Sequence, residues 1–133
     1  AARNEHIHNK ITPALERGDW VLSDRFTDAS YAYQGGGRGL DIKRIEQLEE
    51  WVLQDFTPDM TLLLDIPVEQ GMSRVESRGE KDRIELEAMD FFERVRQAYI
   101  ARSKKYPERI KLINSSKTKE HTSAQIEQIL ASL

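Results

Sequence analysis

Residues 20–39 of this 133-residue chain read WVLSDRFTDASYAYQGGGRG. The first three residues, Trp20 to Leu22, are apolar and follow Gly18-Asp19, which predicts a short buried strand. The strand would end at the charged pair Asp24-Arg25. Because ligands of open α/β sheets bind at the carboxyl ends of strands, this pair is predicted to meet a phosphate or a hydrated metal ion. The alternative is an Asp-Arg pair that only caps the strand.

Three polar residues, Ser30, Tyr33 and Gln34, follow at positions i, i+3 and i+4. They share one face if residues 28–34 form a helix. A carboxamide both donates and accepts hydrogen bonds, as the reading of a base edge requires, and a tyrosine ring closes a pocket against a sugar. The spacing therefore predicts a face suited to a base and its sugar.

These residues resemble, in order and spacing, the pattern of the thymidylate kinases, which phosphorylate deoxythymidine monophosphate (dTMP) with ATP. The resemblance covers most of the chain and includes an arginine-bearing lid similar to that of the bacterial members. It rests on Ala1-Ala2-Arg3, Asp24-Arg25-Phe26, Ser30, Ala32-Tyr33-Gln34, Gly35–Gly39, Thr61–Pro67, Glu69, Gly71, Arg74, Arg78-Gly79 and Asp82-Arg83-Ile84-Glu85.

The resemblance implies an acceptor site for dTMP. Arg25 would hold the acceptor phosphate, and Asp24 would orient it or bind a water of Mg²⁺. Tyr33 would lie against the sugar carbon that lacks a hydroxyl in deoxyribose and would reject the ribonucleotide by clash. The residues expected to read the thymine edge are Arg3, Ser30 and Gln34.

The resemblance also implies a donor site for ATP, with a lid at about residues 74–87. Lid closure would bring Arg74, Arg78 and Arg83 to the phosphates, where the developing charge needs several cations. By composition alone, these arginines also suit a solvated helix face. Ser116 and Lys117 would border the adenine, although a plain connecting loop is the alternative there.

One departure from the family is that no Gly-x-x-x-x-Gly-Lys-Ser/Thr segment exists, since Gly35–Gly39 lacks both the lysine and the following hydroxyl. In the family that loop follows the first strand, so the chain resembles the carboxyl-terminal two thirds of a thymidylate kinase. The strand that carries the loop lies in the family between the strands that correspond to Trp20–Asp24 and Met60–Ile66. Without it two apolar strands would face a gap with unpaired backbone groups. We therefore expect a part of a larger protein, which alone would be unstable, rearranged or paired with another chain.

The fold class expected is α/β, a parallel sheet flanked by helices of the P-loop nucleoside monophosphate kinase type, incomplete because the amino-terminal strands are missing. Residues 1–133 are expected to form a single domain. Besides the strand at 20–22, the pattern predicts strands at 60–66 and 110–113. Helices are predicted at 1–17, 28–34, 40–54, 67–78, 86–104 and 123–133.

Composition indicates an ordinary soluble domain, with 38% hydrophobic residues, 32% charged residues and a formal charge of −3. This balance gives no nucleic-acid footprint, and no apolar run reaches the ~20 residues of a membrane-spanning helix. The chain has no cysteine, which is compatible with the cytoplasm. His6 and His8 are two apart, so on a helix they cannot clamp one metal ion.

Three other functions stay open from the sequence. A deoxynucleoside kinase shares the charged strand end and the lid arginines, but Ala32-Tyr33-Gln34 fits it less well. The residues by themselves also suit a non-catalytic fragment that binds nucleotide or oligomerises, and a purely structural helical assembly is the third alternative. The resemblance further implies a homodimer formed through helices like residues 1–17.

Overall fold

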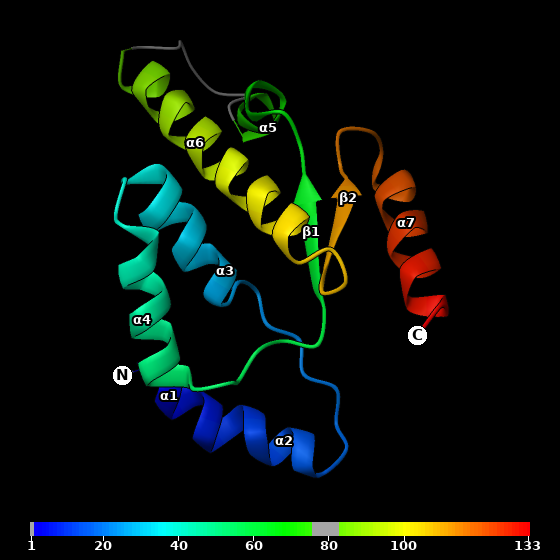
Figure 1. Cartoon of the computed structure of the whole chain (residues 1–133). Helices are drawn as coiled ribbons and strands as arrows, with labels where there is room; N and C mark the ends of the chain where they lie inside the picture. Colours follow the sequence, from blue (N-terminus) through cyan, green and yellow to red (C-terminus); the bar gives the residue numbers. More distant parts are fainter. Residues whose placement is uncertain (1, 76–82) are drawn as a thin grey trace.

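The computed structural model describes the backbone of residues 2–75 and 83–133 and the side chains of residues 2–74 and 88–133. Figure 1 shows a small sheet with helices around it and the amino-terminal helices set below it. In chain order the elements are α1 (Ala2–His6), η1 (Ile7–Ile11), α2 (Thr12–Glu16), α3 (Thr27–Ser30), η2 (Tyr31–Gly37), α4 (Ile42–Leu53), β1 (Thr61–Asp65), α5 (Val68–Val75), α6 (Arg83–Lys105), β2 (Ile110–Asn114) and α7 (Lys119–Ala131), where η marks a π-helical segment.

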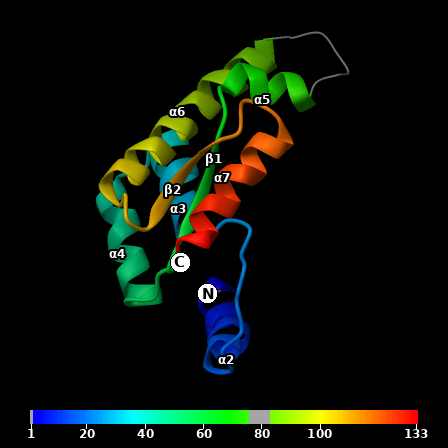
Figure 2. The ribbon, with the colours of Figure 1, turned by 90° about the vertical axis from the view of Figure 1, so that its right-hand side faces the viewer.

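The sheet consists, in the described part of the chain, of β1 and β2. The two strands run parallel, with Thr61 opposite Ile110 and Asp65 opposite Asn114. Parallel neighbours need a long crossover, which α5 and α6 supply. The sheet lies between α6 and α7 in Figure 2, and Ile113 of β2 is fully buried. The predicted strands at 60–66 and 110–113 and the α/β class are confirmed.

The predicted buried strand at Trp20 to Leu22 is wrong. These residues belong to no strand, and Trp20 and Leu22 are 84% and 97% exposed. A strand needs a neighbour to pair its backbone groups, and among the described residues β1 pairs with β2 alone. Asp24-Arg25 therefore follows an irregular, exposed segment and not a buried strand end.

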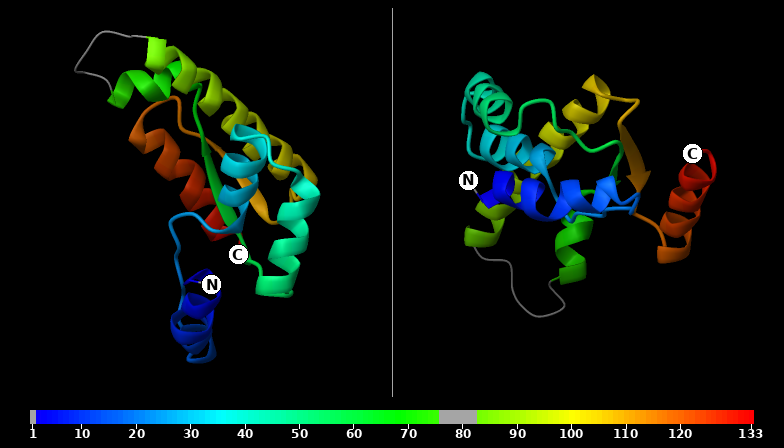
Figure 3. Two further views of the ribbon diagram at one scale, coloured as in Figure 1. Left: turned by 90° about the vertical axis from the view of Figure 1, so that its left-hand side faces the viewer. Right: turned by 90° about the horizontal axis from the view of Figure 1, so that it is seen from below.

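The amino-terminal helices form a continuous rod that Figure 3 shows below the rest of the chain. The rod ends at Gly18, whose left-handed backbone (φ 85°) suits glycine. Ile7 and Ile11 are buried against Leu53 at the end of α4. Two residues of the predicted apolar stripe, Ile7 and Ile11, therefore pack in the chain's own core. The third, Leu15, is exposed.

Other predicted helices are present, with ends that capping residues decide. The helix predicted from residue 40 starts at Ile42, because the Asp41 carboxylate accepts a hydrogen bond from the Lys43 amide (3.0 Å). The final helix starts at Lys119 and not at Ser123, because the Thr118 hydroxyl accepts one from the His121 amide (3.1 Å). Within the described residues, no helix has the length and apolar character needed to cross a bilayer.

Candidate functional site

Arg3 and Ser30 are 27 positions apart in the sequence and meet in the structure. Nη1 of Arg3, on α1, donates a hydrogen bond to Oγ of Ser30, on α3 (3.1 Å). The Arg3 guanidinium also lies 5.5 Å from the centre of the Phe26 ring, within the range of a cation–π interaction. Two of the residues predicted to read the thymine edge are therefore adjacent.

Arg25 has a left-handed backbone (φ 64°), which is uncommon for a residue other than glycine. Its carbonyl oxygen accepts a hydrogen bond from the Ser23 hydroxyl (2.9 Å). Its guanidinium lies 5.2 Å from the centre of the Tyr33 ring. The predicted phosphate-binding arginine and the predicted sugar-facing tyrosine are thus neighbours, and such backbone outliers concentrate at functional sites.

Ser30, Tyr33 and Gln34 lie on one continuous helical stretch, but the stretch widens into the π-helix η2 at Tyr31. Ser30 is half-buried and bonded to Arg3, Tyr33 is half-buried, and Gln34 is exposed. Gln34 is therefore open to a ligand from solvent. Single π-helical turns inside α-helices occur frequently at functional sites.

Tyr99 of α6 belongs to the same region and was missed as a site residue by sequence reasoning. Its ring centre lies 6.2 Å from that of Tyr33. The ring centre of Phe91 is also 6.2 Å from that of Tyr33. Burial, and then the neighbouring Tyr33, raises the pKa of the Tyr99 phenol to about 12. Its phenol therefore stays protonated at neutral pH. The sequence signal was hidden because Tyr99 fits the apolar i, i+4, i+8 stripe of this helix.

Asp28 on α3 is a buried carboxylate, 5% exposed, that sequence reasoning also missed. It accepts hydrogen bonds from Nε of Arg102 (2.8 Å) and from both terminal nitrogens of Arg109 (2.8 and 2.9 Å). Burial is the largest single influence and would raise the pKa of Asp28, but the hydrogen bonds and charges of Arg109 and Arg102 together outweigh it and lower that pKa. We call these three residues the Asp28 clamp.

Gly36 and Gly37, which follow Gln34 and Gly35, pack against α6. A Cβ on Gly36 would lie 2.4 Å from Cβ of Ala98, and a Cβ on Gly37 would lie 2.5 Å from the Phe91 ring. The Arg94 side chain donates two hydrogen bonds to the Gly37 carbonyl oxygen (3.2 and 3.1 Å). These glycines therefore allow two helices to approach closely.

Arg74 on α5 meets the loop that follows β2. Its guanidinium donates to the carbonyl oxygens of Ser115 (3.0 Å), Ser116 (3.4 Å) and Lys117 (3.1 Å). Three residues predicted for the donor nucleotide, Arg74, Ser116 and Lys117, are thus brought together from segments more than 40 positions apart.

Asp65, the last residue of β1, is paired with an arginine of α6. Nε and Nη2 of Arg96 donate to its two carboxylate oxygens (2.8 and 3.1 Å). Asp24 is exposed. Arg78 and the side chain of Arg83, both predicted for the lid, lie outside the described residues, as does the backbone of residues 76–82 within the predicted lid.

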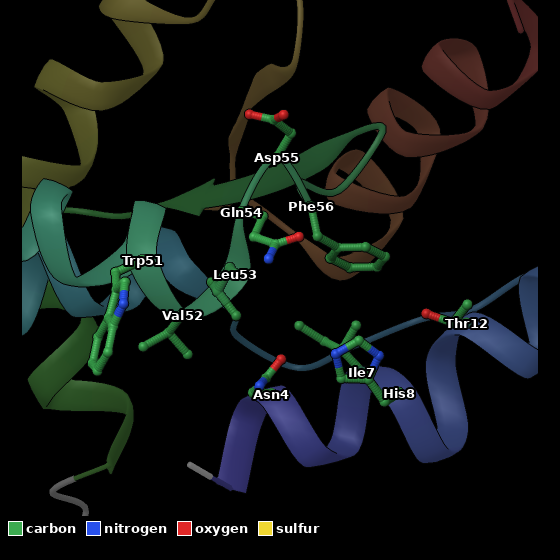
Figure 4. Close-up of a pocket in the computed structure, with 10 residues that line it drawn as sticks. All are labelled: Asn4, Ile7, His8, Thr12, Trp51, Val52, Leu53, Gln54, Asp55 and Phe56. Atoms are coloured by element: carbon green, nitrogen blue, oxygen red, sulfur yellow. The ribbon is translucent and has the colours of Figure 1, made fainter.

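A hollow of about 820 Å³ lies elsewhere, between the amino-terminal rod and the end of α4. Figure 4 shows Asn4, Ile7 and His8 pointing from the rod toward Leu53 and Phe56. Its lining includes none of the residues predicted to bind dTMP or ATP. The hollow is a space between two elements and is separate from the predicted site.

The described residues suit a phosphate ester with an aromatic base better than a resident metal. Arg25 and Arg3 supply guanidinium donors beside aromatic rings, which match planar, anionic ligands. No group of three or more histidine, aspartate or glutamate residues among those described could hold a metal ion. A single exposed carboxylate such as Asp24 still fits Mg²⁺, which keeps several waters and uses substrate phosphates as ligands.

Comparison with known proteins gives one consistent family. The family model described as "Thymidylate kinase" matches residues 1–126. The thymidylate kinase of Ruthia magnifica is 75% identical over 98% of this chain and 63% of its own length, and that of Vesicomyosocius okutanii is 71% identical over the whole chain and 65% of its own. The crystal structure of thymidylate kinase from Ehrlichia chaffeensis has a TM-score of 0.72 and 28% identity, over 96% of this chain and 60% of that one.

The chain thus spans a little under two thirds of the length of these relatives. Within that length the match is continuous and includes α3 and η2, which carry the predicted acceptor residues. The solved relative superimposes on 96% of this chain, which supports the expected α/β class. The chain belongs to the thymidylate kinase family.

Proposed function

We propose that the protein containing these residues transfers a phosphoryl group from ATP to dTMP and forms dTDP. The observation that carries the proposal is the contact of Arg3 with Ser30 beside the contact of Arg25 with Tyr33. These four residues come from two separate helical segments and an irregular segment. Their convergence is what an acceptor site needs, because binding energy is effective in catalysis only when the groups are held in place.

The acceptor would bind to five residues that we call the acceptor face: Arg3, Arg25, Ser30, Tyr33 and Gln34. Arg25 would hold the phosphate by bidentate hydrogen bonds. Arg3 would donate hydrogen bonds to the thymine edge, and Ser30 and Gln34 would donate to it or accept from it. Tyr33 would exclude a 2′-hydroxyl from the sugar. The Tyr99 ring packs edge to face with the Tyr33 ring.

The donor would bind beside α5, where Arg74 already contacts the loop of Ser116 and Lys117. We propose that Arg78 and Arg83 join Arg74 at the phosphates, since phosphoryl transfer is catalysed mainly by positioned charge. Mg²⁺, when bound, neutralises charge on the transferring phosphates. Asp24 would hold one of its waters and orient the Arg25 guanidinium.

For the 133 residues alone we propose nucleotide binding without catalysis, because they contain no phosphate-cradling Gly-x-x-x-x-Gly-Lys-Ser/Thr segment. The test is calorimetric titration with dTMP, with the ribose and cytosine analogues as controls. Selective binding of dTMP supports the assignment of the acceptor face. A folded chain that binds none of the three, or binds all three equally, contradicts it.

Catalysis needs a second experiment. In a chimera, residues 1–133 replace the matching residues of the Ruthia magnifica relative, and the assay offers ATP with either dTMP or deoxythymidine. We expect dTMP to be phosphorylated and the nucleoside to be left unchanged. The opposite preference would favour the deoxynucleoside kinase alternative, and an Arg25→Gln chimera as active as the parent would remove the role proposed for that residue.

We also propose a cytoplasmic homodimer. The apolar side chains of Leu15, on the amino-terminal rod, and of Leu48 and Trp51, on α4, are exposed. The end of α4 packs against the rod. Sedimentation of the chimera distinguishes a dimer from a monomer. A monomer at micromolar concentration contradicts the proposal.

A further inference from the structure

Asp28 lies on α3, near the start of the helical stretch 27–37 formed by α3 and η2, which we call the acceptor helix. It stands three positions after Arg25, two before Ser30 and five before Tyr33. A side chain that fixes Asp28 therefore fixes the orientation of the residues that face the ligand. The inference below relies on the proposed function only for the identity of that ligand.

The clamp joins four elements of the fold. Arg102 comes from α6, and Arg109 directly precedes β2. Nη1 of Arg109 also donates to the Thr61 hydroxyl at the start of β1 (3.2 Å). Both oxygens of Asp28 are used, so the carboxylate ties α3 to α6 and to the beginning of both strands.

The partners of Asp28 are themselves held. The Arg102 guanidinium lies 3.7 Å from the centre of the Tyr31 ring, and the Tyr31 hydroxyl donates to Glu49 of α4. Arg102 and Arg109 both lie near the Tyr106 ring (5.1 and 5.3 Å). The arginines are thus restrained on several sides, and a buried charge network of this kind specifies one geometry.

The far end of the acceptor helix is held by different chemistry. There Gly36 and Gly37 lie directly against α6, and Arg94 bonds to the Gly37 carbonyl oxygen. The acceptor residues Ser30 to Gln34 therefore lie between an ionic attachment at Asp28 and a close-packed attachment at the glycines.

We propose that Asp28 is a positioning residue for the acceptor site. Because Arg102 and Arg109 hold Asp28, it fixes where the acceptor helix lies against α6. It thereby positions the side chains of Arg25, Ser30, Tyr33 and Gln34. It touches neither the base nor the phosphate. Its loss affects the acceptor and leaves the donor site, which is built from α5 and the loop after β2, in place.

The experiment compares the chimera described above, which contains the whole length of the relatives, with its Asp28→Asn and Asp19→Asn variants. Asparagine keeps the size of the side chain and removes its charge. Asp19 is the matched control, because it forms an exposed pair with Arg17 (3.0 Å) away from α6. The first readout is amide hydrogen exchange without ligand, and the second is calorimetric affinity for dTMP and for ATP.

In Asp28→Asn we expect exchange over residues 27–37 to accelerate about 10-fold or more, with α7 changed less than about twofold. Affinity for dTMP falls about 10-fold, while affinity for ATP stays within about twofold. Asp19→Asn changes neither readout. Unchanged exchange at 27–37, an equal acceleration in α7, or an equal loss of both affinities would overturn the proposal.

The experiment can also fail at the binding of dTMP or at the folding of Asp28→Asn. If the unsubstituted chimera does not bind dTMP, the acceptor assignment fails, and hydrogen exchange alone decides the role of Asp28. If Asp28→Asn does not fold, Arg109→Lys takes its place, since lysine keeps the charge and loses the two-oxygen contact. It should show the same selective pattern at smaller amplitude, and a uniform or absent change overturns the inference.

Discussion

Two adjoining segments of this chain, residues 20–26 and the helical stretch 27–37, differ sharply in how they are held. The helical stretch is attached to α6 by the Asp28 clamp and by the glycine contacts. The preceding segment has no regular structure and leaves Trp20 and Leu22 exposed. Both segments nevertheless carry a sequence signal. Apolar residues predict a strand at 20–22, and polar residues at helical spacing predict a helix at 28–34.

A helix and a strand depend on their neighbours to different degrees. A helix satisfies its backbone groups within itself and needs neighbours only for one face. A strand leaves its backbone groups unpaired until another strand lies beside it. The helical stretch forms because α6 is present, whereas residues 20–22 have no strand as neighbour among the described residues.

The largest effect on this comparison should come from Asp28→Ala. It leaves the buried guanidinium groups of Arg102 and Arg109 without their shared carboxylate, and we expect the free energy of unfolding to fall by about 3–5 kcal/mol. Urea unfolding followed by circular dichroism measures it. Asp19→Ala, which removes an exposed pair, is the control and should cost less than about 1 kcal/mol. Equal effects of the two substitutions would show that the clamp contributes nothing beyond a surface ion pair.

A somewhat smaller loss is expected from Gly36→Ala. The added Cβ would overlap Ala98 and lie 2.9 Å from the Arg94 carbonyl oxygen, so the two helices must separate. We expect a cost of about 1–3 kcal/mol in the same urea experiment. Gly35→Ala is the matched control, because its Cβ would have no contact shorter than 3.4 Å. If Gly35→Ala destabilises the chain as much as Gly36→Ala, close approach is not the cause.

The pH dependence of stability tests the ionic part of the attachment. Arg109 and Arg102 hold the pKa of Asp28 below its usual value despite burial. The folded chain therefore binds this proton less readily than the unfolded chain, and the stabilisation is fully present above the unfolded pKa of about 3.9. It is lost as pH falls through the folded value. The difference in unfolding free energy between the parent and Asp28→Asn should be constant from about pH 7 to 5 and shrink below about pH 4. A difference that already shrinks between pH 7 and 5 contradicts this.

The smallest effect is expected at the exposed segment. Leu22→Ala should change the free energy of unfolding by less than about 0.5 kcal/mol, because Leu22 is almost fully exposed. Leu53→Ala removes the same atoms from a buried position and should cost about 2–5 kcal/mol. A cost above about 1 kcal/mol for Leu22→Ala would indicate that this segment is packed in solution.

Much of the fold was predictable because its helices and strands follow from local sequence patterns, and each strand needs only one other strand to pair with. The strands at 61–65 and 110–114 are apolar and pair with each other, and the long helix α6 shows a regular apolar stripe. The ends of α4 and α7 differed from prediction because single capping residues, Asp41 and Thr118, fix them. The strand at 20–22 failed because strand formation depends on a neighbour that sequence periodicity does not report.

The candidate site was predictable where residue type alone carries the chemistry. Arg25, Ser30 and Tyr33 were named from residue type and spacing, and Arg3 was named from the family resemblance. The structure brings these four residues into two adjacent pairs. Tyr99 was missed because an aromatic residue at helical spacing fits a core equally well. Asp28 was missed because its partners lie more than 70 positions away, and no local pattern connects an aspartate to distant arginines.

Family membership, the α/β class and the chemical types of the predicted site residues could be recognised before folding was considered, because they follow from residue identity and short-range spacing. The folded chain was needed to show that Asp28 is a buried attachment point, that Gly36 and Gly37 serve close helix packing, and that Trp20 to Leu22 is not a strand. One cause underlies all three findings. Burial, ion pairing and strand pairing depend on groups brought together from distant parts of the chain.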